Sequence, residues 1–96
     1  MKTVIIFSDQ FSEMENILDV LEISGFNSIP CLTEDDALKC ITLTNFDIVL
    51  IDRKVNRNSQ KNVRENLNRL YPQIPVLVCD SPYQNLTEEI KNTLNL

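Results

Sequence analysis

The sequence contains no histidine and only one glycine, Gly25. Serine–histidine or cysteine–histidine catalysis and phosphate transfer through histidine all need a histidine, so hydrolases and phosphocarriers of these kinds lack their central residue. A glycine-rich loop, which lets a backbone approach a phosphate group closely, is also missing after the first apolar segment. The chain is therefore a poor match to the common small catalytic and nucleotide-binding proteins.

Long hydrophobic segments are also missing. No apolar run approaches the roughly 20 residues that a membrane-spanning helix needs. The N-terminal stretch MKTVIIFSDQ lacks a small-residue cleavage site, so it is predicted to be a strand and not a signal peptide. Three cysteines, at positions 31, 40 and 79, have no metal-binding spacing and suit reduced thiols. We expect a cytoplasmic protein without membrane contacts.

The charge balance is acidic. Nine lysines and arginines stand against fourteen acidic residues, which gives a formal net charge of −5 and argues against a nucleic-acid partner. The basic, asparagine-rich segment 53–64 (RKVNRNSQKNVR) is typical of a solvated loop and helix start, with a phosphate- or nucleic-acid-binding patch as the alternative. With 96 residues, 43% hydrophobic and 24% charged, the chain is predicted to form one globular domain over residues 1–96.

A strand followed by a helix recurs four times along the chain. Three of the four apolar runs are continuous, which is typical of parallel strands buried on both faces. The second contains Pro30, which cannot donate to a ladder and favours an edge strand. The predicted strands are Thr3–Phe7, Ser28–Leu32, Asp47–Ile51 and Ile74–Cys79.

Several helix ends can be read from the sequence. Ser12 and Glu15 have the spacing of a capping box for a first helix, and Gly25 supplies a left-handed stop after it. Thr33 is predicted to cap a second helix that starts with three acidic residues. A third helix follows near position 63, and a last one is predicted over Leu86–Leu94.

The carboxyl ends of parallel strands meet at one edge of a sheet, and ligands bind there. Three aspartates follow predicted strands, namely Asp9, Asp52 and Asp80. A group of carboxylates is a natural site for Mg²⁺, which prefers oxygen ligands. A single aspartate in such a place is more often a turn or helix cap, and Asp80-Ser81-Pro82 is most simply a turn.

The segment FDIVLIDRKV resembles the third strand of response-regulator receiver domains (CheY-like), which ends in the phosphoacceptor aspartate. TVIIFSDQ resembles their first strand and YPQIPVLVCD their fourth. The resemblance implies an α/β, flavodoxin-like three-layer sandwich with four parallel strands in the order 2-1-3-4 and helices on both faces. It also implies that Asp52 is the phosphoacceptor, that a histidine kinase is the partner, and that Mg²⁺ is held by Asp9, Asp52 and the backbone carbonyl of Lys54.

The sequence departs from the receiver pattern in several places. Ser8 stands where receivers have the first of two acidic residues, and Asp80 stands where they have a threonine or serine that contacts the phosphoryl group. Ser81 is the nearest substitute for that hydroxyl. A fifth strand with its lysine, and the helix after it, are missing, so that only Lys54 or a neighbouring subunit could supply a cation.

Three functions follow from this comparison. The first is a phosphoacceptor in a two-component phosphorelay, with no enzymatic activity beyond a receiver's own phosphorylation and dephosphorylation. The second is a pseudo-receiver that acts as a phosphorylation-independent interaction or dimerisation module. The third is a small flavodoxin-like phosphate- or cofactor-binding protein, which the loop at residues 8–12 does not favour because it lacks glycine.

Without a fifth unit, the fourth strand is predicted to be an exposed edge, with apolar side chains uncovered on the face that only the first helix covers. We therefore expect a homodimer, or a partner protein that completes the sheet. The candidate contacts are Val76 and Val78 in the strand and Leu86, Ile90 and Leu94 in the last helix.

Overall fold

Strands and helices alternate along the whole chain, and the computed structural model describes all of residues 1–96. The strands are β1 (Thr3–Phe7), β2 (Asn27–Cys31), β3 (Ile48–Asp52) and β4 (Val76–Cys79). The helices are α1 (Phe11–Ile23), α2 (Glu34–Leu43), α3 (Arg57–Leu70) and α4 (Leu86–Leu94). The sequence predicted β1 and α4 with these bounds and the other strands to within two residues at either end. None of the four helices has the length and apolar character needed to cross a membrane.

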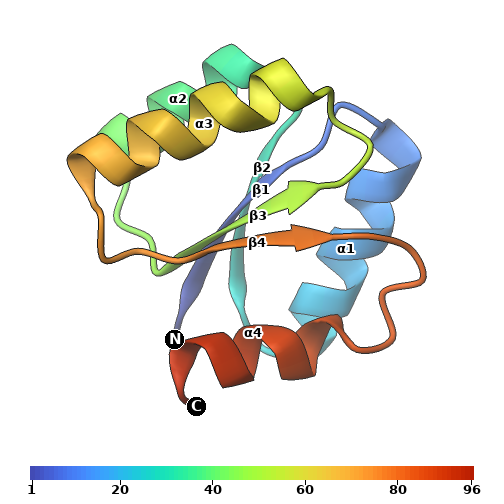
Figure 1. Cartoon of the computed structure of the whole chain (residues 1–96). Coiled ribbons are helices and arrows are strands. Elements are labelled where there is room, and N and C mark those ends of the chain that lie inside the picture. The colour runs from blue at the N-terminus through green and yellow to red at the C-terminus, as the bar shows by residue number, and fades with distance from the viewer.

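The four strands form one parallel sheet in the order β2-β1-β3-β4 (Figure 1). The predicted strand order and fold class are thus confirmed. Pro30 lies in β2, opposite Ile6 of β1, and β2 is an edge strand as predicted. All five residues of β3 are buried, whereas three of the four in β4, the other edge, are only half-buried.

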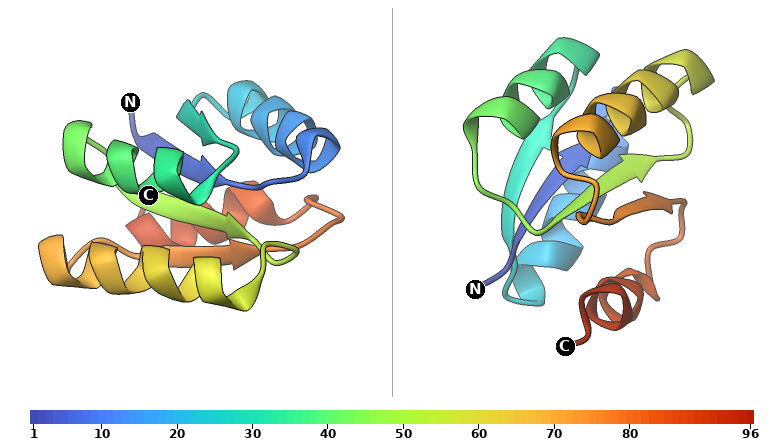
Figure 2. Two further views of the ribbon diagram at one scale, coloured as in Figure 1. Left: turned by 90° about the horizontal axis from the view of Figure 1, so that it is seen from above. Right: turned by 60° about the vertical axis from the view of Figure 1, so that its left-hand side comes forward.

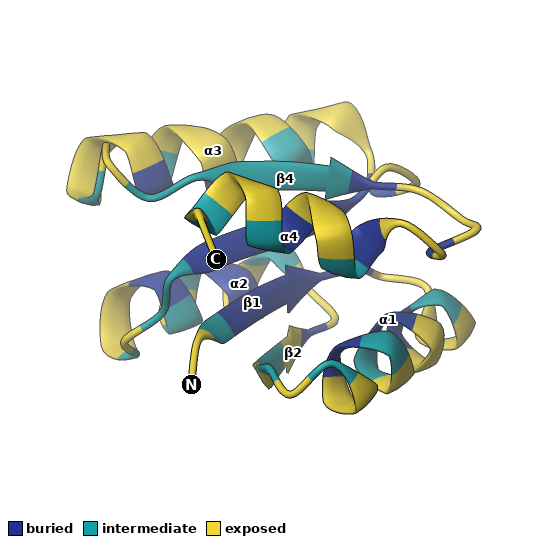
Figure 3. Ribbon diagram, turned by 90° about the horizontal axis from the view of Figure 1, so that it is seen from below, coloured by how far each residue is buried: buried dark blue, intermediate teal, exposed yellow.

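Two helices cover each face of the sheet. Helices α2 and α3 lie side by side over one face, as Figure 2 shows from above. Helices α1 and α4 cover the opposite face (Figure 3), where Met14, Ile17 and Ile90 pack with Ile48 and Leu50 in one hydrophobic cluster. The prediction that only the first helix covers this face, leaving apolar side chains exposed, is therefore wrong.

The position of α4 also corrects part of the predicted dimer contact. Leu86 and Ile90 are buried in the core of the single chain, so neither is available to a partner. Leu94 is half-buried and packs against the same cluster. Val76 and Val78 of β4 remain half-exposed, and they stay the predicted contact residues.

Of the three helix ends predicted from the sequence, two are confirmed by the structure. Thr33 caps α2 by accepting a hydrogen bond of 3.1 Å from the amide of Asp36, as predicted. Gly25 has a positive φ of 83° just after α1 and stops the helix, also as predicted. The Ser12 capping box is wrong, since α1 begins two residues earlier, with Gln10 at its N-cap and no side-chain cap.

Candidate functional site

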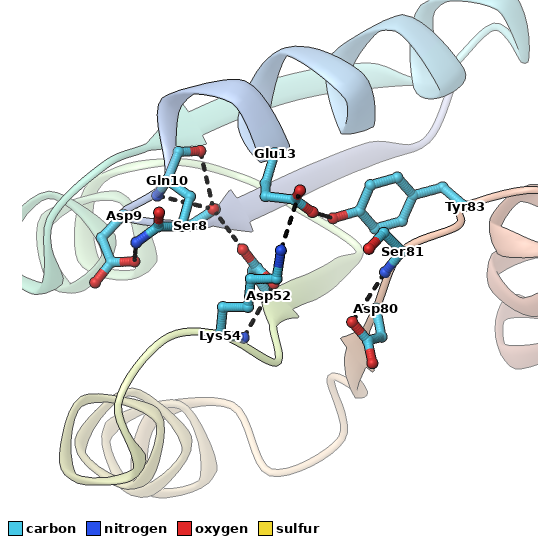
Figure 4. Close-up of polar contacts among 9 residues, drawn as sticks. All are labelled: Ser8, Asp9, Gln10, Glu13, Asp52, Lys54, Asp80, Ser81 and Tyr83. Carbon is cyan, nitrogen blue, oxygen red and sulfur yellow. Dashed lines mark hydrogen bonds and ion pairs between the residues drawn. The ribbon is translucent and has the colours of Figure 1, made fainter.

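Asp52 is the last residue of β3, at the carboxyl edge of the sheet, and it is fully buried. Its Oδ2 accepts a hydrogen bond of 2.8 Å from the Ser8 hydroxyl, and its Oδ1 accepts one of 3.1 Å from the Lys54 amide (Figure 4). A buried carboxylate is costly unless its oxygens are hydrogen-bonded. Both oxygens of Asp52 meet that condition through donors of the protein itself.

Ser8 reaches Asp52 because of the pairing between β1 and β3. Phe7 lies opposite Ile51 in the ladder, so the next residue of each strand, Ser8 and Asp52, meet just beyond it. Ser8 is fully buried as well, and its hydroxyl oxygen accepts a hydrogen bond of 3.2 Å from the Gln10 amide. The residue therefore ties the turn between β1 and α1 to the end of β3.

The other predicted site residues do not join Asp52. Asp9 is exposed, its carboxylate accepts a hydrogen bond of 3.2 Å from the Gln10 side chain, and Figure 4 shows it directed away from Asp52. Asp80 is exposed and lies 3.8 Å from the Arg53 guanidinium. Ser81 is exposed too, and its amide donates to Asp80 at 3.0 Å.

The three aspartates thus do not form one metal-binding group, and no three histidine, cysteine, aspartate or glutamate side chains gather anywhere to hold a metal ion. That part of the sequence prediction is wrong, because Asp9 and Asp80 face solvent while Asp52 faces the core. Mg²⁺ needs free carboxylate oxygens. As the residues lie, each oxygen of Asp52 accepts one hydrogen bond from the protein and Asp9 is directed away from it, so Asp9 and Asp52 do not share a ligand set. Mg²⁺ held by Asp9, Asp52 and the Lys54 carbonyl stays a prediction.

A second polar group lies beside Asp52 and was not predicted from the sequence. Glu13 in the first turn of α1 accepts hydrogen bonds from the Tyr83 hydroxyl and, at 3.3 Å, from the Lys54 ammonium group (Figure 4). The Glu13 side chain is only 13% exposed. The only sequence signal for Glu13 is an acidic residue near the start of the first predicted helix. Lys54, the candidate cation, is therefore paired with Glu13 and not with Asp52.

The contacts around Asp52 and Glu13 shift the pKa values of three neighbouring groups. The hydrogen bond from Tyr83 and the nearby Lys54 ammonium hold the pKa of Glu13 below its usual range. Burial raises the pKa of the Tyr83 hydroxyl, and its bond to Glu13 raises it further. Burial, with the charge of Asp52 nearby, raises the pKa of the Cys79 thiol to about 12. Glu13 is thus ionised at neutral pH, while Tyr83 and Cys79 stay neutral and supply no nucleophile.

The lowered pKa of Glu13 predicts a pH dependence of stability. A carboxyl group whose pKa is lower in the folded than in the unfolded chain stabilises the fold above the unfolded pKa, and this contribution is lost as the pH falls through the folded pKa. Between about pH 6 and pH 3, the melting temperature of the wild type should therefore fall more than that of Glu13→Gln. Thermal melts of both proteins across this range test the prediction, and parallel curves would contradict it.

The comparisons with known proteins identify the fold. No family model and no curated protein sequence matches the chain. Solved structures do match over nearly its whole length. A receiver domain from Clostridium thermocellum has a TM-score of 0.86 and 18% identity, with 99% of this chain and 95% of that chain covered. The chain has the receiver fold.

Two further receiver structures agree with it. The response regulator TrrA from Thermotoga maritima, in complex with Mg²⁺–BeF, has a TM-score of 0.80 and 17% identity, with 98% of this chain and 100% of that chain covered. The receiver domain of NtrC4 from Aquifex aeolicus has a TM-score of 0.83 and 17% identity, with coverage of 99% and 98%. Identities this low establish the fold and leave function to the site itself.

Proposed function

We propose that this receiver-fold chain is a protein-interaction module that works without phosphorylation, with Asp52 in a structural role. The observation that carries the proposal is the closed environment of Asp52. Its side chain is inaccessible to solvent, and both of its oxygens are held by Ser8 and Lys54. A phosphoacceptor must instead offer a free oxygen to the incoming phosphorus atom and hold a cation beside it.

Replacement of an acid by Ser8 is central to this proposal. A serine hydroxyl donates to Asp52, whereas a carboxylate in the same place would repel Asp52 unless a cation lay between them. The hydroxyl therefore satisfies Asp52 without a metal ion. It fits a site that stabilises the junction of β1 and β3 and has no need of Mg²⁺.

A second candidate function is phosphoacceptance at Asp52 with Mg²⁺ and a histidine kinase as partner. One observation favours it: Asp52 ends β3 of a receiver fold, and receiver structures of this fold include one in complex with Mg²⁺–BeF. For this function Asp52 would have to give up the Ser8 bond and Asp9 would have to turn toward it.

One experiment separates the two functions. Intact-mass spectrometry after incubation with Mg²⁺ and acetyl phosphate is expected to show no added phosphoryl group on the folded wild type. Asp52→Asn is the matched control, and an active receiver domain in the same mixture verifies the phosphodonor. A gain of one phosphoryl group in the wild type that is absent from Asp52→Asn would establish the phosphoacceptor and overturn the proposal.

An interaction module needs a surface for its partner, and the exposed edge of β4 is the surface we propose. The partner can be a second copy, which would give the homodimer expected from the sequence, or another protein. The two differ in the charge that they bring to the edge.

A further inference from the structure

The outer edge of β4 carries backbone groups without partners. Pro75 and Cys79 direct their carbonyl groups toward β3, where they accept from Val49 and Arg53 at 3.2 and 2.8 Å. Because bonding direction alternates along a strand, the N–H and C=O groups of Val76 and Val78 point outward. An edge of this kind binds a further strand through main-chain hydrogen bonds.

A hollow lies on each side of this edge. One of about 250 Å³ lies between α3 and β4, with Leu67, Ile74 and Val76 as its apolar part and Arg64 at its rim. The other, of about 170 Å³, lies between β4 and α4, and its lining includes Val78 and Leu86 together with the charged residues Arg53, Asp80 and Glu89. Side chains of an added strand would alternate between the two faces and so enter the two hollows in turn.

The rim on the α3 side is basic. Arg57, Lys61 and Arg64 follow one another at positions i, i+4 and i+7 of α3, and all three are exposed. They line a third hollow of about 410 Å³, which shares Arg64 with the hollow at β4. Lys61 pairs loosely with Glu65 at 3.9 Å, while Arg57 and Arg64 form no ion pair. This cationic stripe stands out on a chain of net charge −5.

The stripe decides between the two kinds of partner. A second copy would pair β4 with β4 through a two-fold axis perpendicular to the sheet, which keeps corresponding faces on the same side. Helix α3 would then lie beside α3 of the other copy and bring the two basic stripes together. Like charges brought together in an interface weaken association, whereas an acidic segment would meet opposite charge.

We propose that the β4 edge binds an acidic, extended segment of a partner protein as a fifth strand, in preference to a second copy. The inference rests on the proposed function in that it gives the interaction module its partner. Main-chain hydrogen bonds to Val76 and Val78 supply the pairing. The stripe of Arg57, Lys61 and Arg64 selects for acidic side chains on the α3 face.

The test uses the full chain and two synthetic peptides of about nine residues, the length of a long strand. One alternates glutamate with valine and the other alternates lysine with valine. Titration followed by amide NMR is expected to show binding of the glutamate peptide, with shifts at Val76 and Val78. The lysine peptide should bind about tenfold more weakly than the glutamate peptide. Added salt should lower the affinity of the glutamate peptide.

Three variants make the test specific. Arg64→Glu should lower the affinity for the glutamate peptide about tenfold, because it reverses the charge at the rim of the hollow between α3 and β4. Val78→Pro removes an outward N–H and leaves the ladder with β3 intact, so a loss of about tenfold is expected here too. Lys39→Glu makes the same charge change on the exposed part of α2 and should leave binding unchanged.

Equal binding of the two peptides, no binding of either, or shifts away from β4 would overturn the inference. So would a dimer in sedimentation at micromolar concentration that Val78→Pro dissociates, because a second copy would then occupy the edge. None of these results adds a phosphoryl group to Asp52. They therefore leave the mass-spectrometric test of the proposed function independent.

Discussion

Replacing Ile90 by alanine is expected to lower the free energy of unfolding by about 3 kcal/mol, within the range for large-to-small changes in a core. Ile90 is fully buried in the cluster that joins α4 to α1 and the sheet. The loss combines the transfer free energy of the removed methyl and methylene groups with the cavity that remains. It would be a large share of the roughly 5–15 kcal/mol that stabilises a small domain.

Urea denaturation of the wild type and the variant measures this difference. Asn92→Ala, on the exposed side of α4, is the matched control and should change the free energy of unfolding by less than about 0.5 kcal/mol. If Ile90→Ala and Asn92→Ala behaved alike, α4 would not be packed on the α1 face in solution.

Replacing Asp52 by alanine is expected to lower the free energy of unfolding by about 2–4 kcal/mol. The change leaves the Ser8 hydroxyl and the Lys54 amide without their partner, and each unsatisfied buried group costs about 1–3 kcal/mol. Asp52→Asn keeps the shape, accepts from the Lys54 amide and donates to Ser8. Its free energy of unfolding should lie within about 1 kcal/mol of the wild type.

The comparison of these two variants tests the structural role of Asp52 directly. Urea denaturation at neutral pH gives both values. An increase in the free energy of unfolding on Asp52→Ala would show that the buried carboxylate destabilises the fold. A stability cost of that kind is typical of residues kept for chemistry, and it would favour phosphoacceptance.

Most of the fold could be predicted from the sequence because its signals are local. Continuous apolar runs gave the buried strands, Pro30 the edge, and Gly25 and Thr33 the helix ends. The face covered by α4 could not be predicted. The right-handed crossover rule fixes the side of a helix between two parallel strands, and no strand follows α4. The apolar spacing of Leu86, Ile90 and Leu94 shows that one side of α4 packs on an apolar surface, but not which face of the sheet supplies that surface.

The candidate site was predicted in part for a similar reason. The end of β3 placed Asp52 at the carboxyl edge of the sheet, and the side-chain direction there follows the strand. Adjacent residues alternate, so Ser8 and Asp9 could not both face Asp52, and the buried position went to Ser8. The contact between Glu13 and Tyr83 joins residues 70 positions apart in the sequence, so no local sequence pattern predicts it.

The strand order has a consequence for how the chain can fold while it is being synthesised. β1 leaves the ribosome first and forms an interior strand, with β2 added on one side and β3 and then β4 on the other. Every new strand joins an existing edge, so none has to insert between two that are already paired. The sheet can therefore grow outward during translation, with α4 closing the second face last.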